Sequence, residues 1–120
     1  MPIRAIRGAV QVDVDERAAI LEGTTELVSE VMARNDLVPD DVISVLFTVT
    51  PDLRTEFPAL AARKIGFQDV PLLCATEIPV PGALPRVVRL MMHVDTDRSR
   101  REIQHVYLRG AAALRLDIAQ

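Results

Sequence analysis

Residues 42–49, VISVLFTV, are apolar in both alternating phases of the chain. Successive side chains of a β-strand point to opposite faces, so a strand of this composition is expected to be covered on both sides. The chain has 120 residues, of which 49% are hydrophobic. This length predicts one compact domain over residues 1–120 and excludes two ordinary domains, and the apolar content excludes a disordered chain.

Apolar spacing and turn residues elsewhere predict the order β-α-β-α-β-β-β. The predicted strands are residues 3–12, 42–49, 70–76, 87–95 and 105–114, and the predicted helices are residues 13–35 and 57–65. Asp13 and Glu16 have the spacing of a capping box for the long helix, and Gly66 stops the short one. The order predicts an α/β or α+β domain with one mixed sheet, followed by a short tail over residues 115–120.

The composition excludes several classes of function. No apolar run is long enough for a transmembrane helix, and the first residues lack the apolar stretch of a signal peptide, so we expect a cytoplasmic protein. The formal net charge of −3 disfavours a nucleic-acid partner. The single cysteine, Cys74, excludes an intrachain disulfide and a cysteine-based zinc site. The two histidines, His93 and His105, stand apart, so no metal is expected.

Three charged residues lie in or beside the apolar strands: Arg7, Glu77 and Arg89. An isolated charge is costly to bury, so each should face a partner, solvent or a ligand. In residues 87–95 the even positions are all apolar and form the core face, which places Arg89 and His93 on the opposite face. Periodicity alone leaves two interpretations of Arg89 open, a solvated surface residue and a ligand-binding residue.

Five segments of the chain carry specific motifs. They are Ile3-Arg4-Ala5-Ile6-Arg7-Gly8-Ala9, Thr50-Pro51-Asp52-Leu53, Phe57-Pro58-Ala59, Val88-Arg89-Leu90-Met91-Met92 and His105-Val106-Tyr107-Leu108. Together they resemble the trimeric, AroH-class chorismate mutases, and the element order agrees over nearly the whole chain. The resemblance implies a mixed five-stranded sheet with helices on one side, in a homotrimeric pseudo-barrel with each active site between two subunits. Small residues of the last predicted strand suit such packing: Ala111, Ala112 and Ala113.

The resemblance also implies an activity, the rearrangement of chorismate to prephenate in phenylalanine and tyrosine biosynthesis, and a role for each catalytic residue. Arg7 would bind the side-chain carboxylate of chorismate with help from Tyr107. Arg89 would reach the ether oxygen of the breaking bond and the same carboxylate. Glu77 and Cys74 would contact the ring hydroxyl. Without the resemblance, Cys74 fits a small buried hydrophobe and Tyr107 an ordinary strand aromatic.

A second group of residues is implied to shape the pocket. The apolar wall from the neighbouring subunit would consist of Phe57, Ala59, Leu72 and Leu73. Leu114 would pack against the substrate from the first subunit, and Arg63 and Arg115 would lie near the mouth, where the ring carboxylate faces solvent. Some members of the family carry a lysine at position 60, where this chain has Leu60, so the mouth has one positive charge fewer.

The implied chemistry agrees with what the sequence lacks. No phosphate-binding glycine loop, dinucleotide fingerprint or Ser-His-Asp arrangement is visible. A pericyclic step needs no nucleophile, metal or cofactor, but it needs a folded substrate and donors aimed at the developing charge. Two other classes stay open: a non-catalytic trimeric module that binds a dicarboxylate through Arg7 and Arg63, and a trimeric imine deaminase of the Rid type. The motifs around Arg89 and Tyr107 favour the mutase.

Overall fold

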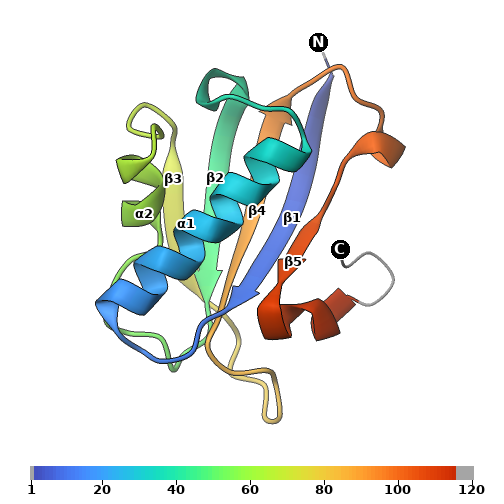
Figure 1. The fold of residues 1–120 in the computed structure, drawn as a ribbon. Helices are drawn as coiled ribbons and strands as arrows, with labels where there is room; N and C mark the ends of the chain where they lie inside the picture. The colour runs from blue at the N-terminus through green and yellow to red at the C-terminus, as the bar shows by residue number, and fades with distance from the viewer. Residues whose placement is uncertain (1, 116–120) are drawn as a thin grey trace.

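The computed structural model describes residues 2–115, without the side chain of Arg115. Five strands form one sheet in the order β3-β2-β4-β1-β5. Their bounds are β1 Ile3–Gln11, β2 Val42–Val49, β3 Leu72–Thr76, β4 Val87–Asp95 and β5 Val106–Leu108. Strand β4 pairs antiparallel with β1 and β2, while the edge strands β5 and β3 pair parallel with β1 and β2 respectively. The prediction of a mixed five-stranded sheet is therefore confirmed (Figure 1).

The two α-helices, α1 (Arg17–Arg34) and α2 (Ala59–Lys64), lie on the same face of this sheet (Figure 1). Three short 3₁₀ helices connect or follow the strands: η1 Pro39–Asp41, η2 Arg100–Glu102 and η3 Arg109–Arg115. The main core lies between the helices and the sheet. Its largest fully buried side chains include Ile6, Ile20, Leu27, Phe47, Phe67 and Met92. Burial of this apolar surface is the main force that holds the two layers together.

The predicted phase of β4 is confirmed. Val88, Leu90, Met92 and Val94 are all buried against the helices, whereas Arg89 is half-buried and His93 exposed. The expectation that residues 42–49 are covered on both sides is wrong within one chain, because both helices pack on the same face. Ile43 and Leu46 in β2 keep 42% and 38% of their surface exposed. The sheet therefore has one covered face and one open face.

The predicted capping box at the start of α1 is not formed. The helix begins later than expected, with Glu16 as its N-cap residue and no side-chain hydrogen bond at the cap. Asp13 lies in a bend before it. In the same bend, the Asp15 carboxylate accepts hydrogen bonds from the backbone N–H groups of Arg54 and Thr55. A tertiary contact has replaced the local cap.

The predicted last strand, residues 105–114, is also too long. Strand β5 ends at Leu108 because Arg109 adopts a positive φ of 55°, outside the extended region. The chain continues as η3, so Ala111–Ala113 lie in a 3₁₀ helix and not in a strand. Ala111 is fully buried within its own chain, beside Ala9, Val87 and Tyr107, and cannot serve packing between subunits.

Candidate active site

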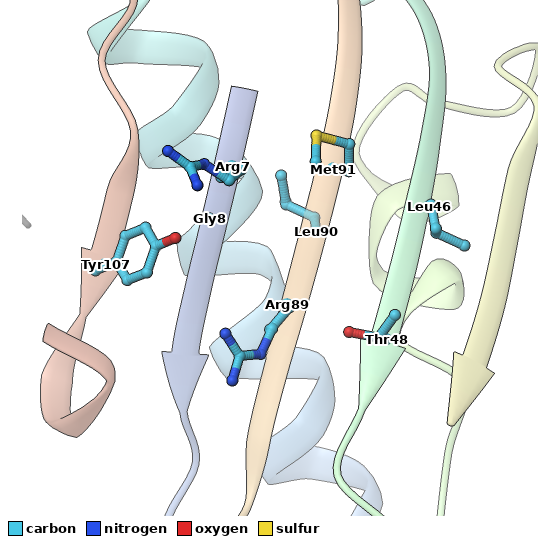
Figure 2. Close-up of a pocket in the computed structure, with 8 residues that line it drawn as sticks. All are labelled: Arg7, Gly8, Leu46, Thr48, Arg89, Leu90, Met91 and Tyr107. Carbon is cyan, nitrogen blue, oxygen red and sulfur yellow. The ribbon is translucent and has the colours of Figure 1, made fainter. Parts of the chain in front are cut away.

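The open face of the sheet carries a cavity of about 320 Å³ over β1, β2, β4 and β5. Its lining consists of Arg7, Gly8, Leu46, Thr48, Arg89, Leu90, Met91 and Tyr107 (Figure 2). In the antiparallel ladder Arg7 is opposite Met91 and Ala9 is opposite Arg89, so the two arginines stand diagonally on neighbouring strands. An added Cβ on Gly8 would lie 3.1 Å from Leu27 Cδ1 and 3.2 Å from Val106 O, so a side chain there would crowd both neighbours.

The orientation of Arg89 is set by Glu77. Arg89 Nε donates to Glu77 Oε2 at 2.9 Å, and Thr48 Oγ1 donates to the same oxygen at 2.7 Å. The side chains are 39% exposed for Arg89 and 19% exposed for Glu77, so the pair is only partly screened by water. A guanidinium has five N–H donors, and this contact uses Nε. The two terminal nitrogens can therefore serve a ligand in the cavity.

Tyr107 closes the β5 side of the cavity. Its side chain is buried, with 4% exposed, in a small cluster with Ala9, Val87 and Ala111 on the open face. Leu114, from η3, packs against this cluster. In Figure 2 the Tyr107 hydroxyl points toward β1, on the side where Arg7 and Arg89 lie. The structure thus brings together five of the predicted residues: Arg7, Glu77, Arg89, Tyr107 and Leu114.

Phe57 and Cys74 line a different hollow, of about 240 Å³, at the β3 edge of the sheet. Cys74 points toward the helix-covered face, where it packs against the main core. Its side chain therefore does not line the Arg7–Arg89 cavity of the same chain. Phe57 is 68% exposed although it is a large apolar residue. One chain thus carries two separated groups of predicted site residues.

The remaining predicted residues differ in exposure. Leu73 is 66% exposed, and Leu72 is half-buried against the main core. Arg63 is exposed in the last turn of α2. Ala59 is 3% exposed and belongs to the core, so its side chain offers almost no surface to a second subunit. The predicted contact of Arg115 and the tail over residues 115–120 lie outside the described side chains.

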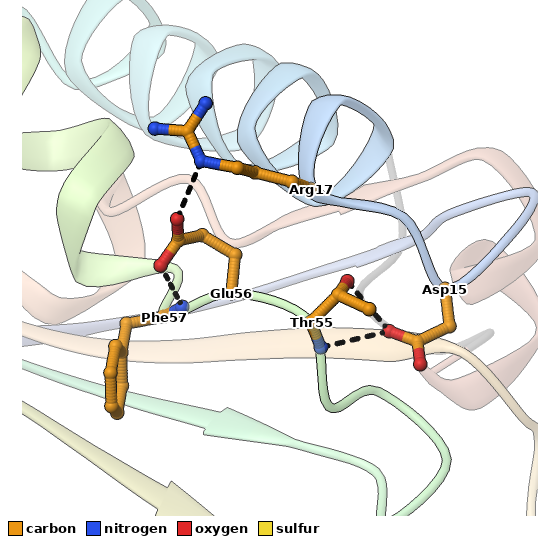
Figure 3. A network of polar contacts seen from close by, with 5 residues as sticks. All are labelled: Asp15, Arg17, Thr55, Glu56 and Phe57. Carbon is orange, nitrogen blue, oxygen red and sulfur yellow. Dashed lines mark hydrogen bonds and ion pairs between the residues drawn. The ribbon is translucent and has the colours of Figure 1, made fainter.

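The loop that carries Phe57 is held by two carboxylates (Figure 3). Asp15 Oδ1 accepts the N–H of Arg54 at 2.9 Å and the N–H and hydroxyl of Thr55 at 3.2 and 2.9 Å. Glu56 accepts Arg17 Nε at 2.8 Å and the N–H of Phe57 at 2.9 Å. The N–H of Arg54 lowers the pKa of Asp15, and the N–H of Phe57 lowers that of Glu56. The backbone that carries the exposed Phe57 ring is therefore held in place by these hydrogen bonds.

Five residues that line the cavity were not predicted as site residues: Gly8, Leu46, Leu90, Thr48 and Met91. Thr48 and Met91 are the two whose side chains carry a heteroatom. Both have the same strand phase as Arg89, since Thr48 is paired with Arg89 across β2 and β4. The alternation of residues 42–49 contained that signal, because Thr48 is one of only two polar residues in the strand, with Ser44. Which polar residue would lie beside Arg89 depends on the register of the two strands.

Two further findings concern metal ligands and membrane-spanning helices. Within residues 2–115 no three His, Cys, Asp or Glu side chains are grouped as ligands of a metal ion. Over the same range no helix is both long and apolar enough to cross a membrane. An apolar cavity lined by two arginines and a tyrosine, with an oriented carboxylate beside it, has the chemistry that suits a small, carboxylate-bearing molecule in an α/β protein.

Comparison with known proteins gives the family. Residues 3–118 match the family described as chorismate mutase type I. The chain is 46% identical over 117 residues to a chorismate mutase AroH of Thermus thermophilus, covering 97% of this chain and 96% of that protein. It is 42% identical over 120 residues to a chorismate mutase AroH of Bacillus subtilis (strain 168), covering 99% and 94%.

A solved structure agrees with these relatives. A chorismate mutase from Clostridium thermocellum superposes with a TM-score of 0.91 at 46% identity, covering 92% of this chain and 98% of that one. The chain belongs to the type I chorismate mutase family, and the resemblance inferred from its motifs is confirmed. It is an enzyme of that class.

Proposed function

We propose that the chain rearranges chorismate to prephenate in the cavity between Arg7 and Arg89, as a homotrimer whose active sites lie between two subunits. The observation that carries this proposal is the orientation of Arg89. Glu77 accepts the N–H of Arg89 Nε and is itself held by the Thr48 hydroxyl, so a fixed carboxylate directs the terminal nitrogens of Arg89 within an apolar cavity. A donor fixed before the reaction needs no reorganisation when charge develops.

Arg7 and Tyr107 would bind the side-chain carboxylate of chorismate. Both line the cavity with Arg89, and a planar guanidinium matches a carboxylate through two parallel hydrogen bonds. The Tyr107 ring is fixed by its burial, so its hydroxyl is preorganised. Holding this carboxylate favours the folded conformer in which the two reacting carbon atoms meet, which is the orientation part of catalysis.

Arg89 would stabilise the transition state. As the C–O bond lengthens, negative charge grows on the ether oxygen, and a cation beside it is bound more tightly in the transition state than in the substrate. The Oε2 atom of Glu77 is used by Arg89 and Thr48. We assign its other oxygen, Oε1, to the ring hydroxyl of the substrate. The step forms no covalent bond to the enzyme and needs no cofactor.

The open face supports a shared site. Leu46 and Leu73, on β2 and β3, are exposed there, and exposed apolar side chains favour contact with another protein surface. Phe57 and Cys74 lie apart from the Arg7–Arg89 cavity of their own chain, so they would reach a substrate only from a neighbouring subunit. We assign Phe57, Leu73 and Arg63 to the wall and mouth of the neighbour's site, and Cys74 to that same group.

We propose the cytoplasm as the compartment of the enzyme, where a free thiol such as that of Cys74 stays reduced. The activity is tested by following the loss of chorismate absorbance and identifying prephenate by NMR, with Arg89→Ala as the inactive control. Conversion that depends on Arg89 supports the proposal. Binding of chorismate without conversion would instead indicate a binding module, and release of ammonia from an imine would indicate a deaminase.

A further inference from the structure

The backbone N–H of Arg7 bonds to a side chain and not to the backbone of β5. Arg7 N–H donates to Nδ1 of His105 at 3.0 Å. This N–H points toward β5, but the ladder between β1 and β5 pairs only Gly8, Ala9 and Val10 with residues 106–108. His105 precedes the first paired residue of β5. Its imidazole therefore extends the ladder by one hydrogen bond, at the residue whose side chain lines the cavity.

The direction of this bond fixes the protonation of the ring. Nδ1 accepts, so it carries no proton, and the imidazole is neutral with its proton on Nε2. An imidazolium has a proton on both nitrogens and cannot accept the Arg7 N–H. Histidine is also the side chain whose ordinary charge change falls between pH 5 and 8. A proton on Nδ1 would therefore break the contact to Arg7.

The bond matters because β5 is so short. It has three residues, and their pairing places Tyr107 opposite Ala9. A slip of one residue would turn Tyr107 to the helix-covered face. The preceding residue is fixed from the other side, since Asn35 Oδ1 accepts Gln104 N–H at 2.8 Å and Asn35 Nδ2 donates to Gln104 O at 2.9 Å. Asn35 and His105 thus fix the segment that leads into β5.

The hollow that His105 lines carries several basic side chains among the described residues. Its volume is about 500 Å³, and its charged and titratable groups come from three other places in the fold, namely Arg4 and Arg7 from β1, His93 from β4 and Arg100 from η2. Among the described residues that line this hollow, none is acidic. A proton added to Nδ1 of His105 would remove the acceptor of the Arg7 N–H.

We propose that His105, as a neutral imidazole, is a positioning residue that holds Arg7 and Tyr107 for the substrate carboxylate. Protonation of His105 releases the Arg7 N–H and loosens the start of β5, so carboxylate binding weakens at acid pH. This inference rests on the proposed function only for its link to chorismate. The hydrogen bond itself is a property of the fold, and it can be tested without substrate.

The test uses two isosteres. In His105→Asn the amide oxygen can take the place of Nδ1, so the acceptor stays but cannot titrate. In His105→Gln the polar group lies nearer the position of Nε2, so the acceptor for Arg7 is lost. KM and kcat for chorismate are measured from pH 8 to pH 5 for both variants and the parent. His93→Asn is the matched control, because His93 lines the same hollow without contacting the Arg7 backbone.

For the parent and for His93→Asn we expect KM to rise about fivefold toward pH 5 with a smaller change in kcat, as loss of one hydrogen bond predicts. His105→Asn should keep the pH 8 KM at every pH, and His105→Gln should have the raised KM throughout. Thermal unfolding confirms that each variant is folded. An acid-dependent KM that survives in His105→Asn would overturn the proposal, because the asparagine amide does not titrate between pH 8 and pH 5.

A second measurement separates this inference from the proposed function. In ¹⁵N-labelled protein without substrate, the amide resonance of Arg7 should shift between pH 8 and pH 5 in the parent and stay constant in His105→Asn. An Arg7 amide that ignores pH in the parent would overturn the role of His105. Absence of chorismate turnover, with the shift present, would overturn only the proposed function.

Discussion

Arg89 on β4 and Glu77 just after β3 meet across β2, with Nε and Oε2 2.9 Å apart. Strand β2 lies between β3 and β4 and ends at Val49. The N–H of Glu77 donates to Val49 O at 2.9 Å, which holds Glu77 beside the end of β2. The Glu77 side chain can therefore lie over Thr48 and reach Arg89. The Glu77 carboxylate orients the Arg89 guanidinium, but its negative charge also weakens the positive potential that the guanidinium presents to the substrate.

Replacement of Arg89 should damage kcat more than any other single change. Removal of one oxyanion-type donor costs about 10²–10³-fold in kcat, and we expect Arg89→Ala to lose at least that. Arg89→Lys keeps the charge but loses the planar fork that can span the ether oxygen and the carboxylate, so it should not restore the rate fully.

Charge and shape at Arg89 can be separated with citrulline, a neutral isostere. Steady-state kinetics of the citrulline variant should show chorismate binding near the parent level with kcat strongly reduced. A citrulline variant with the parent rate would mean that the pocket walls act by selecting the conformer, without electrostatic stabilisation.

Thr48→Val should lower kcat about threefold to tenfold with little change in KM. Its hydroxyl helps to hold Glu77 Oε2, so its loss leaves Glu77 with more freedom and Arg89 less well directed. Thr48→Ser is the matched control, because it keeps the hydroxyl and should retain most of the activity. Equal losses in the two variants would indicate that the threonine methyl group, and not the hydrogen bond, is important.

Arg63→Ala should raise KM more than it lowers kcat. Arg63 is exposed at the end of α2, where it can attract the dianionic substrate equally well before and during the reaction. Such an exposed charge acts through solvent, so its effect should shrink as the salt concentration rises. Lys64→Ala removes the neighbouring exposed cation and is the control for a general effect of charge. A loss of kcat at constant KM would place Arg63 at the reacting bond.

Stability should fall on acidification below about pH 5, in part through the loop that carries Phe57. The pKa values of Asp15 and Glu56 are lowered in the folded chain, chiefly by the backbone N–H groups of Arg54 and Phe57. A group with a lowered folded pKa stabilises the fold above its unfolded pKa, and this contribution is lost as pH falls through the folded value.

The pH dependence of Tm, measured from pH 7 to pH 3, checks this. Asp15→Asn and Glu56→Gln should have a lower Tm than the parent at pH 7 and approach it at pH 3. Asp13→Asn, which changes a carboxylate in the same bend as Asp15, should have the same Tm as the parent at pH 7 and at pH 3. A constant Tm difference across the range would show that the two carboxylates act through shape and not through charge.

Mixed trimers should recover activity from two inactive variants. If each site combines the Arg89 cavity of one subunit with Phe57 of the next, then Arg89→Ala and Phe57→Asp trimers are both impaired. Refolding them together in equal amounts should restore about a quarter of the sites by random assortment around a closed ring. Sedimentation should give a trimer for each sample. No recovery in a trimeric mixture would place the whole site within one subunit.

Much of the fold followed from local patterns in the sequence. Alternation in residues 87–95 predicted which side chains of β4 form the core and that Arg89 lies on the other face, and both were confirmed. Helical spacing predicted the end of α1, and the positive φ of 110° at Gly66 agrees with a helix stop there. These features depend on the backbone geometry of a few consecutive residues, which the residue types determine directly.

Other features depended on contacts between distant residues. The sequence could not predict that Asp15 would accept the N–H groups of Arg54 and Thr55 in place of capping α1, or that Arg109 would end β5. It also could not show that Cys74 would line the hollow at the β3 edge while Glu77 would contact Arg89. Strand order and register bring such groups together, and neither is encoded in a short window of sequence. The sequence by itself determined which side chains face the same way along each element, because that is a local property of the backbone. Only the tertiary structure decided which of them meet, because pairing across the sheet is set by burial summed over the whole chain.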